Sequence, residues 1–315
     1  MTNRETIDFL RQNDNYLIIN HRRPDGDAVG SAAALCRGLR QIGKTAKVWK
    51  NPETTERYLT YLVDLETMEI PEDATLVAVD LAAETLLPLN GLDFAGRIML
   101  SIDHHMSNTR YACHTNVNAE YAACGELLLE LLREMGPVTK EIAEALYLAI
   151  STDTGCFQYS NVTGNTLRAA AELKDCGADT FTINRTMFGT KSIARLRLES
   201  ALTDSAEFYA GGLVAVCCIS QNMMDSIGAT EDDAEDISGF PRSMAGVQIG
   251  VLIKELREGG AKISLRTGEA YNASEICMKL GGGGHKAAAG AQDDAGIQSA
   301  KLRILEAISE SGVDL

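Results

Sequence analysis

The chain up to about Gly189 alternates short apolar runs with helix-like stretches, and this alternation constrains the fold most strongly. The apolar runs cover residues 16–20, 44–49, 75–80 and 97–103, and each is bounded by turn-forming or polar residues. Helical patterns lie between and after these runs, and several end in glycine, as helices commonly do. Such alternation is typical of a largely parallel sheet. We therefore predict an α/β domain over residues 1–189, with helices on both faces of its sheet.

The remainder of the chain follows a different pattern, which fits the two domains expected for 315 residues. Residues 191–210 read as a long polar helix, so we assign 190–210 to a helical connector. Strand-like runs then follow one another at 212–220, 246–256 and 261–267, before a helix at 272–280 and a final amphipathic helix from about Ala295. This order predicts a smaller α+β domain over residues 211–315.

Charge and cysteine usage exclude several classes of protein. Lys and Arg number 29 against 44 Asp and Glu, a net charge of −15, which disfavours long duplex DNA and anionic membranes as partners. The eight cysteines show no metal-binding spacing, and no apolar run approaches the roughly 18 residues of a membrane span. We expect a cytoplasmic protein with reduced thiols. The oligomeric state stays open, and a homodimer is one of the states the sequence allows.

Charged side chains follow the first apolar run directly. His21, Asp25 and Asp27 lie in the segment HRRPDGD, between a predicted strand and a predicted helix. Open α/β sheets bind ligands at this kind of position, and two acids two residues apart can point into one crevice. The segment contains neither GxGxxG nor a Walker A lysine, so nucleotide binding of those two kinds is excluded. A polar turn that caps the next helix remains the simpler alternative for this segment alone.

The same arrangement recurs at two later strand ends. The run TLVAVD ends in Asp80, and RIMLSID ends in Asp103, followed by His104 and His105. Each run is apolar up to its last residue, a pattern that solvated surface does not explain. Carboxylate and imidazole ligands without a nearby thiolate suit Mn²⁺ or a similar divalent ion better than structural zinc.

A further acid lies near the end of a strongly apolar helix. Asp153 follows the run EIAEALYLAIST, where an isolated carboxylate is costly to bury unless it is paired or bound to metal. Together with the acids and histidines of the strand ends, it brings the candidate ligands to six or seven. That number is too large for one ion and suits two ions that share a carboxylate.

Five motifs in this order resemble a known family. HRRPDGDAVGS, VAVD, DHH and STDTG closely resemble the four motifs of the DHH phosphoesterases. KISLRT followed by GGGGHKAAAG resembles their associated C-terminal domain. At this length the chain is most similar to the bifunctional oligoribonuclease/pAp phosphatases (nanoRNases) of that family. One departure is Cys124, where many relatives carry Ser or Thr. The resemblance implies an active site in the cleft between the two domains.

The resemblance also implies a role for each motif residue. His21 and Asp25 would bind a first metal ion, and Asp80 would bridge both ions. The second ion would be bound by Asp27, His104 and Asp153. His105 would lie against the scissile phosphate, with Asp103 supporting it from behind. The substrate-binding residues of the second domain would be Arg266, Gly281, Gly282, Gly283, Gly284 and His285. The glycine run also suits this role on chemical grounds, because a backbone without Cβ atoms can approach an anion closely.

The implied activity is metal-dependent hydrolysis of short single-stranded RNA to mononucleotides, and of 3′-phosphoadenosine 5′-phosphate (pAp) to AMP. Two divalent ions, for which we expect Mn²⁺, would activate the attacking water and neutralise charge on both oxygens of the displacement. The principal alternative keeps this chemistry but cleaves a cyclic dinucleotide or its linear product pApA. A non-enzymatic nucleotide sensor is less consistent with the sequence, because no motif ligand is lost.

Overall fold

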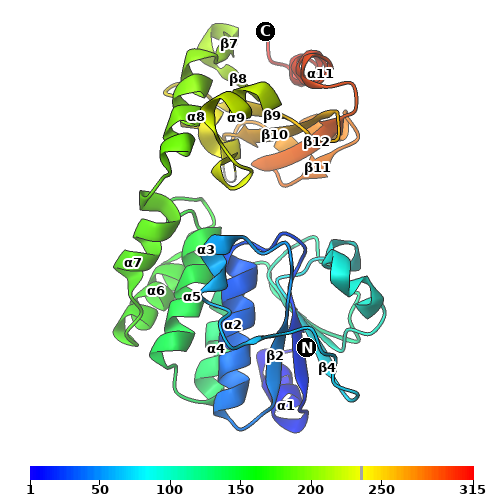
Figure 1. The fold of residues 1–315 in the computed structure, drawn as a ribbon, viewed down its shortest axis with the longest axis vertical. Helices are drawn as coiled ribbons and strands as arrows, with labels where there is room; N and C mark the ends of the chain where they lie inside the picture. Colours follow the sequence, from blue (N-terminus) through cyan, green and yellow to red (C-terminus); the bar gives the residue numbers. More distant parts are fainter. Residues whose placement is uncertain (235–236) are drawn as a thin grey trace. The chain divides into compact units, whose positions relative to one another are not determined.

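The computed structural model describes residues 1–234 and 237–315, which divide into two compact units, Met1–Thr190 and Lys191–Leu315 (Figure 1). In the first unit the described strands form a six-stranded sheet in the order β3-β2-β1-β4-β5-β6, with every neighbouring pair parallel. The strands are β1 (Tyr16–Ile19), β2 (Ala46–Trp49), β3 (Glu66–Thr67), β4 (Thr75–Val79), β5 (Leu100–Asp103) and β6 (His114–Val117). The predicted parallel α/β sheet is confirmed. The strand order reverses between β1 and β4, the position at which such sheets bind ligands.

Helices pack on one face of this sheet. They are α1 (Asn3–Gln12), α2 (Gly26–Gln41), α3 (Glu56–Leu59), α4 (Cys124–Met135), α5 (Lys140–Asp153), α6 (Gly164–Asp175) and α7 (Thr180–Asn184). α2 lies beside α5 (Figure 1), and a Cβ atom on Gly30 would lie 2.3 Å from the carbonyl oxygen of Ala145. The contact therefore requires glycine, and the close approach brings the first turn of α2 next to the last turn of α5.

The opposite face of the sheet is covered differently from our expectation. A separate apolar cluster joins Leu17, Ile19, Leu76 and Ala78 to the chain after β4. That chain forms two 3₁₀ helices, η1 (Glu84–Leu86) and η2 (Leu89–Phe94), in place of the α-helices predicted for this face. Trp49 packs edge-on against Phe94, with ring centroids 5.1 Å apart. This cluster packs against β1 and β4 on the face of the sheet opposite the α-helices.

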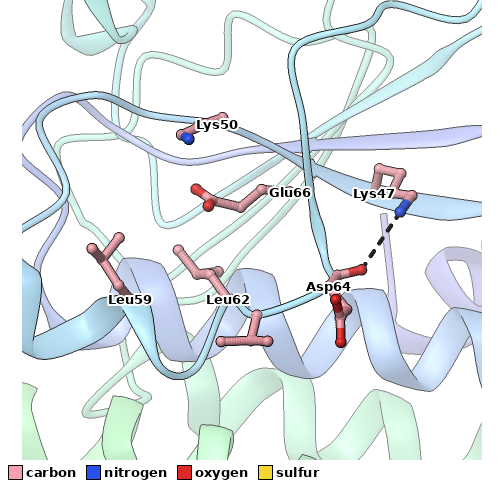
Figure 2. Close-up of a pocket in the computed structure, with 7 residues that line it drawn as sticks. Lys47, Lys50, Leu59, Leu62, Asp64 and Glu66 are labelled. Carbon is pink, nitrogen blue, oxygen red and sulfur yellow. Dashed lines mark hydrogen bonds between the residues drawn. The ribbon is translucent and has the colours of Figure 1, made fainter.

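The two outermost strands were not predicted. β3 has only two residues, and β6 (HTNV) is polar, so neither carries an apolar run. His114 is the first residue of β6 and packs against the ring of Phe9. Figure 2 shows a surface pocket at the β3 edge, where Lys47 and Lys50 flank Glu66. A short edge strand flanked by lysines discourages pairing with another chain.

The second unit contains a mixed sheet. Its described strands run in the order β11-β12-β10-β9-β8-β7, in which only β8 and β9 pair in parallel. They are β7 (Glu207–Tyr209), β8 (Val214–Ile219), β9 (Ile249–Glu255), β10 (Ala261–Thr267), β11 (Gly283–Gly284) and β12 (Ala288–Asp293). The α+β prediction for this part of the chain is therefore confirmed.

Helices cover both faces of this second sheet. α10 (Ala273–Met278) and α11 (Ile297–Ser309) share one apolar cluster with β9 and β10. α8 (Ile193–Asp204), α9 (Gln221–Ile227) and the 3₁₀ segment Ile237–Ser243 share the other. The helix predicted over 191–210 is shorter than expected, because the chain enters β7 at Glu207. No helix in the described ranges is both long and apolar enough to cross a membrane.

Candidate metal centre

The carboxyl ends of β1, β4 and β5 carry the charged residues singled out in the first unit. His21 follows β1, Asp80 follows β4 directly, and Asp103 is the last residue of β5. Asp25 is the N-cap residue of α2, where its carboxylate accepts the N–H of Ala28 at 3.0 Å. A loop-to-helix turn at a sheet edge thus presents several acids and imidazoles to one region, as the sequence predicted.

One group of three possible ligands lies at the rim of this region. His21, Asp25 and Asp80 each offer an atom within 4.8 Å of the other two. Nε2 of His21 lies 3.8 Å from Oδ1 of Asp25 and 3.8 Å from Oδ2 of Asp80. These separations are too long for hydrogen bonds and leave room for a cation between the three atoms.

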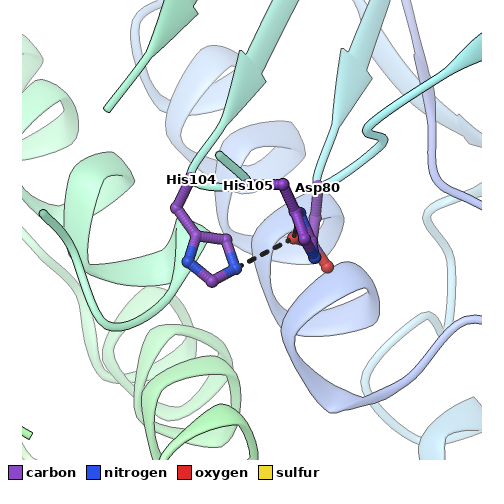
Figure 3. Close-up of side chains that lie close together, drawn as sticks. All are labelled: Asp80, His104 and His105. Atoms are coloured by element: carbon purple, nitrogen blue, oxygen red, sulfur yellow. Dashed lines mark ion pairs between the residues drawn. The ribbon is translucent and has the colours of Figure 1, made fainter. Parts of the chain in front are cut away.

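A second group lies deeper. It consists of Asp27, His104 and Asp153, again with one atom each within 4.8 Å of the others. Nε2 of His104 lies 3.6 Å from Oδ2 of Asp27 and 3.5 Å from Oδ2 of Asp153. The same nitrogen is 3.6 Å from Oδ1 of Asp80 (Figure 3). Oδ2 of Asp80 therefore faces His21, while Oδ1 faces His104 and also lies 3.4 Å from Nδ1 of His105.

Two buried polar atoms in these groups have no hydrogen-bond partner among the described residues. They are Oδ1 of Asp80 and Nε2 of His104. Buried polar atoms normally find a partner, and a divalent cation is the partner that would satisfy both of these at once. Asp80 also has a left-handed backbone (φ 52°), a strained conformation for a non-glycine residue that is commonly found at functional sites. The residues present thus fit a metal site.

The carboxylates in this cluster have strongly perturbed acidities. Burial, and then the charges of Asp27 and other neighbouring acids, raises the pKa of Asp80 well above its usual range. Asp153 is affected in the same direction for the same reasons. Asp25 differs: the surrounding protein partly desolvates it and acts against its ionisation, but the interaction with nearby His21 outweighs this and lowers its pKa to about 2. Crowded acids of this kind repel one another unless a cation lies between them.

Asp103 orients the second histidine of the DHH segment. Its Oδ1 accepts Nδ1–H of His105 at 2.8 Å, and its Oδ2 accepts the side-chain amide of Asn108 at 2.6 Å. Burial opposes the charged imidazole, but Asp103 outweighs it and raises the pKa of His105 to about 8. Sequence reasoning missed Asn108, although its position five residues after Asp103, in the same loop, could have suggested it.

Main-chain groups of α4 hold Asp27, and sequence reasoning missed these as well. The N–H groups of Cys124 and Gly125 donate to the two oxygens of Asp27 at 2.7 and 3.0 Å. The N-cap residue Ala123 has no side chain that could cap the helix, so Asp27 of α2 performs this role from another helix. The thiol of Cys124 turns away and donates to the carbonyl oxygen of Ile102.

Comparison with known proteins identifies the family. Residues 15–150 match the domain described as "DHH family, N-terminal domain", and residues 212–311 match the "DHHA1 domain". The chain is 34% identical to the bifunctional oligoribonuclease and PAP phosphatase NrnA of Thermus thermophilus over 93% of its own length and 89% of the relative. This chain belongs to the DHH family. The NrnA protein of Bacillus subtilis is 26% identical over 91% of the chain.

Other similar proteins differ in length or are alike in fold. A cyclic-di-AMP phosphodiesterase, PdeA of Listeria monocytogenes, is 26% identical over 96% of this chain, which matches only 48% of that protein. The crystal structure of an exopolyphosphatase-related protein from Bacteroides fragilis superposes with a TM-score of 0.88 at 23% identity, covering 98% of this chain and 95% of that one. This second likeness confirms the fold of the chain.

The DHHA1 unit brings its predicted residues to one end of its sheet. Arg266 on β10 pairs with Ala288 of β12, and its Nη2 donates to Oγ of Ser238 at 2.8 Å. The backbone of His285 forms a tight turn with Ala288, to which its N–H donates. Part of the glycine run belongs to the sheet, because Gly283 and Gly284 form β11. A Cβ atom on Gly282 would lie 2.1 Å from the carbonyl oxygen of Gly290, so this glycine is needed for packing against β12.

Proposed function

We propose that this chain is a metal-dependent phosphoesterase that hydrolyses short oligoribonucleotides to mononucleotides and pAp to AMP. The observation that carries the proposal is the position of Asp80 between two ligand groups, with Oδ2 towards His21 and Oδ1 towards His104. That arrangement suits a carboxylate that bridges two divalent ions, for which we propose Mn²⁺. The NrnA names of the T. thermophilus and B. subtilis relatives support the substrate class.

Each residue of the cluster has a role in this proposal. His21, Asp25 and Asp80 hold one ion, while Asp27, His104 and Asp153 hold the other with Asp80. Bound ions supply charge neutralisation and a water of lowered pKa. In the metal-free protein, although burial opposes it, Asp103 raises the pKa of His105 to about 8, so its imidazole carries a proton at neutral pH before the ions bind. Asp103 accepts Nδ1–H of His105, and Nε2–H is the donor that we propose for a phosphate oxygen of the substrate.

The DHHA1 unit would bind a second substrate phosphate. Arg266 offers a guanidinium, which matches phosphate through two parallel hydrogen bonds, and His285 adds a further donor. The main-chain N–H groups of the Gly281–Gly284 run are the other proposed contacts. Short RNA and nucleotides are therefore the partners we propose, in a cytoplasmic protein with a net charge of −15 that repels long polyanions.

One experiment separates this function from its main alternative. The full chain is incubated with Mn²⁺ and a panel of pAp, RNA of 2 to 24 nucleotides, pApA and cyclic di-AMP, with Asp80→Asn as the inactive control. We expect the fastest turnover on pAp and RNA dimers. Faster turnover of cyclic di-AMP or pApA than of the dimers would favour the alternative, as the relationship to PdeA suggests. No turnover of any substrate would overturn the proposal.

A further inference from the structure

We infer that Glu126 is a positioning residue for His104, acting through the single peptide group that joins Tyr121 to Ala122. The inference rests on the proposed function, because it concerns a histidine proposed to hold a metal ion. Oε2 of Glu126 accepts the N–H of Ala122 at 3.1 Å. The carbonyl oxygen on the other side of that peptide, from Tyr121, lies 3.2 Å from Nδ1 of His104.

The direction of this chain of hydrogen bonds fixes the tautomer of His104. A carbonyl oxygen can only accept, so Nδ1 of His104 must carry the hydrogen and Nε2 keeps its lone pair. That lone pair points to Asp27, Asp80 and Asp153. The carboxylate of Glu126 polarises the intervening peptide, which strengthens its carbonyl as an acceptor. Carboxylates that bind metal-ligating histidines directly perform the same task, here carried out through a peptide group.

Glu126 itself is built firmly into the structure. Its side chain is 5% exposed, and the hydroxyl of Thr166 on α6 donates to the same Oε2 at 3.1 Å. It is the third residue of α4, where a glutamate commonly reaches back to the N-cap amide. Here it reaches one residue further, to Ala122. The contact therefore serves the segment before the helix and not the helix cap.

A second side chain holds the same segment from the opposite side. Nδ2 of Asn161 donates to the carbonyl oxygen of Ala122 at 3.0 Å and to that of Asp153 at 3.1 Å. The amides of Cys124 and Gly125 donate to Asp27. All three members of the deeper ligand group are therefore linked by hydrogen bonds, directly or through Asn161, to residues 121–125. Loss of Glu126 would release the 121–122 peptide and, with it, the orientation of the His104 ring.

The test compares Glu126→Gln with Glu126→Ala in the full chain. Glutamine keeps a carbonyl oxygen that can accept from Ala122, whereas alanine leaves that N–H without a partner. We expect Glu126→Ala to weaken Mn²⁺ binding at the deeper group by about 10- to 100-fold, and Glu126→Gln to retain most of the affinity. Mn²⁺ titration followed by electron paramagnetic resonance measures this without any substrate.

A spectroscopic measurement distinguishes positioning from general destabilisation. In ¹⁵N-histidine-labelled, metal-free protein, we expect His104 to show the Nδ1–H tautomer in the wild type and in Glu126→Gln, and mixed tautomers in Glu126→Ala. Asn116→Ala is the matched control, because Asn116 is a buried residue whose side-chain amide donates to Asn3 and Thr6 and not to the 121–125 segment. It should lower stability but leave the His104 signal unchanged.

Two results would overturn the inference. One is an unchanged tautomer together with unchanged Mn²⁺ affinity in Glu126→Ala. The other is an equal loss of both in Asn116→Ala. If Glu126→Ala does not fold, the same spectrum is recorded for Glu126→Gln and Thr166→Val. Because glutamine can still accept from Ala122, an altered His104 tautomer in Glu126→Gln alone would also contradict the inference. A wild-type protein that binds no Mn²⁺ would refute the proposed function, while the tautomer measurement would still test the role of Glu126.

Discussion

Replacing Asp80 by asparagine should stabilise the metal-free protein while destroying its response to metal. Asp80 is 2% exposed, and its Oδ1 has no hydrogen-bond partner among the described residues. Asparagine has the same shape and carries no charge, so it ends the repulsion with the neighbouring acids, and loss of this buried, unpaired charge should recover roughly 1–3 kcal/mol. The raised pKa of Asp80 also gives the direction in which stability changes with pH. Because folding raises the pKa of Asp80, the metal-free wild type loses stability as the pH rises from about 4, the unfolded-state value, through the raised folded-state pKa.

Metal should reverse the order of stability. At a Mn²⁺ concentration 100 times its dissociation constant, one bound ion adds about 2.7 kcal/mol to the wild type. For a unit of this size, that corresponds to roughly 5–11 °C in Tm. Asp80→Asn should keep little of this gain, because an amide supplies no charge to either ligand group. We therefore expect the variant to melt above the wild type in EDTA and below it in Mn²⁺.

The fluorescence of Trp49 provides the assay. It is the only tryptophan in the chain and is buried against Phe94, beside the strands that carry the site, so its emission follows the first unit. Thermal unfolding of both proteins is recorded at pH 7 in EDTA and in Mn²⁺. A variant that melts below the wild type in EDTA would contradict the reasoning about burial and repulsion. An equal Mn²⁺ shift in both proteins would contradict the position of Asp80 in a metal site.

Three further predictions concern acidity, substrate binding and the second unit. Mn²⁺ affinity should fall as the pH is lowered from 7.5 to about 5.5, because His21 and His104 bind metal only when neutral. Although burial opposes it, Asp25 raises the pKa of His21. An Mn²⁺ affinity that does not change over this pH range would exclude histidine ligation. Arg266→Ala and His285→Ala should lower kcat/KM on pAp and RNA dimers by roughly ten- to a hundredfold, and less on a 15-mer, with Mn²⁺ binding unchanged; equal losses on all three would rule out a role in measuring length. Asp293→Ala should destabilise the second unit by about 2 kcal/mol in urea unfolding followed by circular dichroism, since Asp293 binds Arg303, Ser299 and the N–H of Ala295. Although burial acts in the opposite sense, these hydrogen bonds lower the pKa of Asp293. Its contribution to the free energy of unfolding is therefore present above about pH 4, and the difference in stability between variant and wild type should vanish as the pH falls below that value.

The sequence predicted which strand ends would carry the site, because each central strand is a buried apolar run that stops at an acid or a histidine. Asp80 and Asp103 illustrate this directly, since each lies at the end of such a run. The edge strands escaped prediction because an edge strand needs no apolar face. β3 is only two residues long, and β6 consists of the polar run HTNV.

The finer arrangement of the site depends on groups that a sequence pattern does not display. Asp25 and Asp27 are two residues apart, yet α2 begins between them, so Asp25 caps the helix at the surface while Asp27 is buried within its first turn. Two of the partners of Asp27 are main-chain amides, which a sequence pattern does not display. Glu126 carries no motif of its own, and its position depends on how α4 lies against α2 and α6.

Asp27 belongs to the deeper ligand group and also caps the first turn of α4. The deeper group should therefore tolerate substitution less well than the group at the rim. Substitution of Asp27 would remove a helix cap as well as a ligand, so a single mutation there damages two features at once. Asp25 is the N-cap residue of α2, but its side chain is 55% exposed, and Asn or Ser could replace it as a cap. Relatives that have drifted towards another metal or lost activity should therefore differ first at Asp25 and His21. Efforts to alter metal selectivity by design should begin at the same rim.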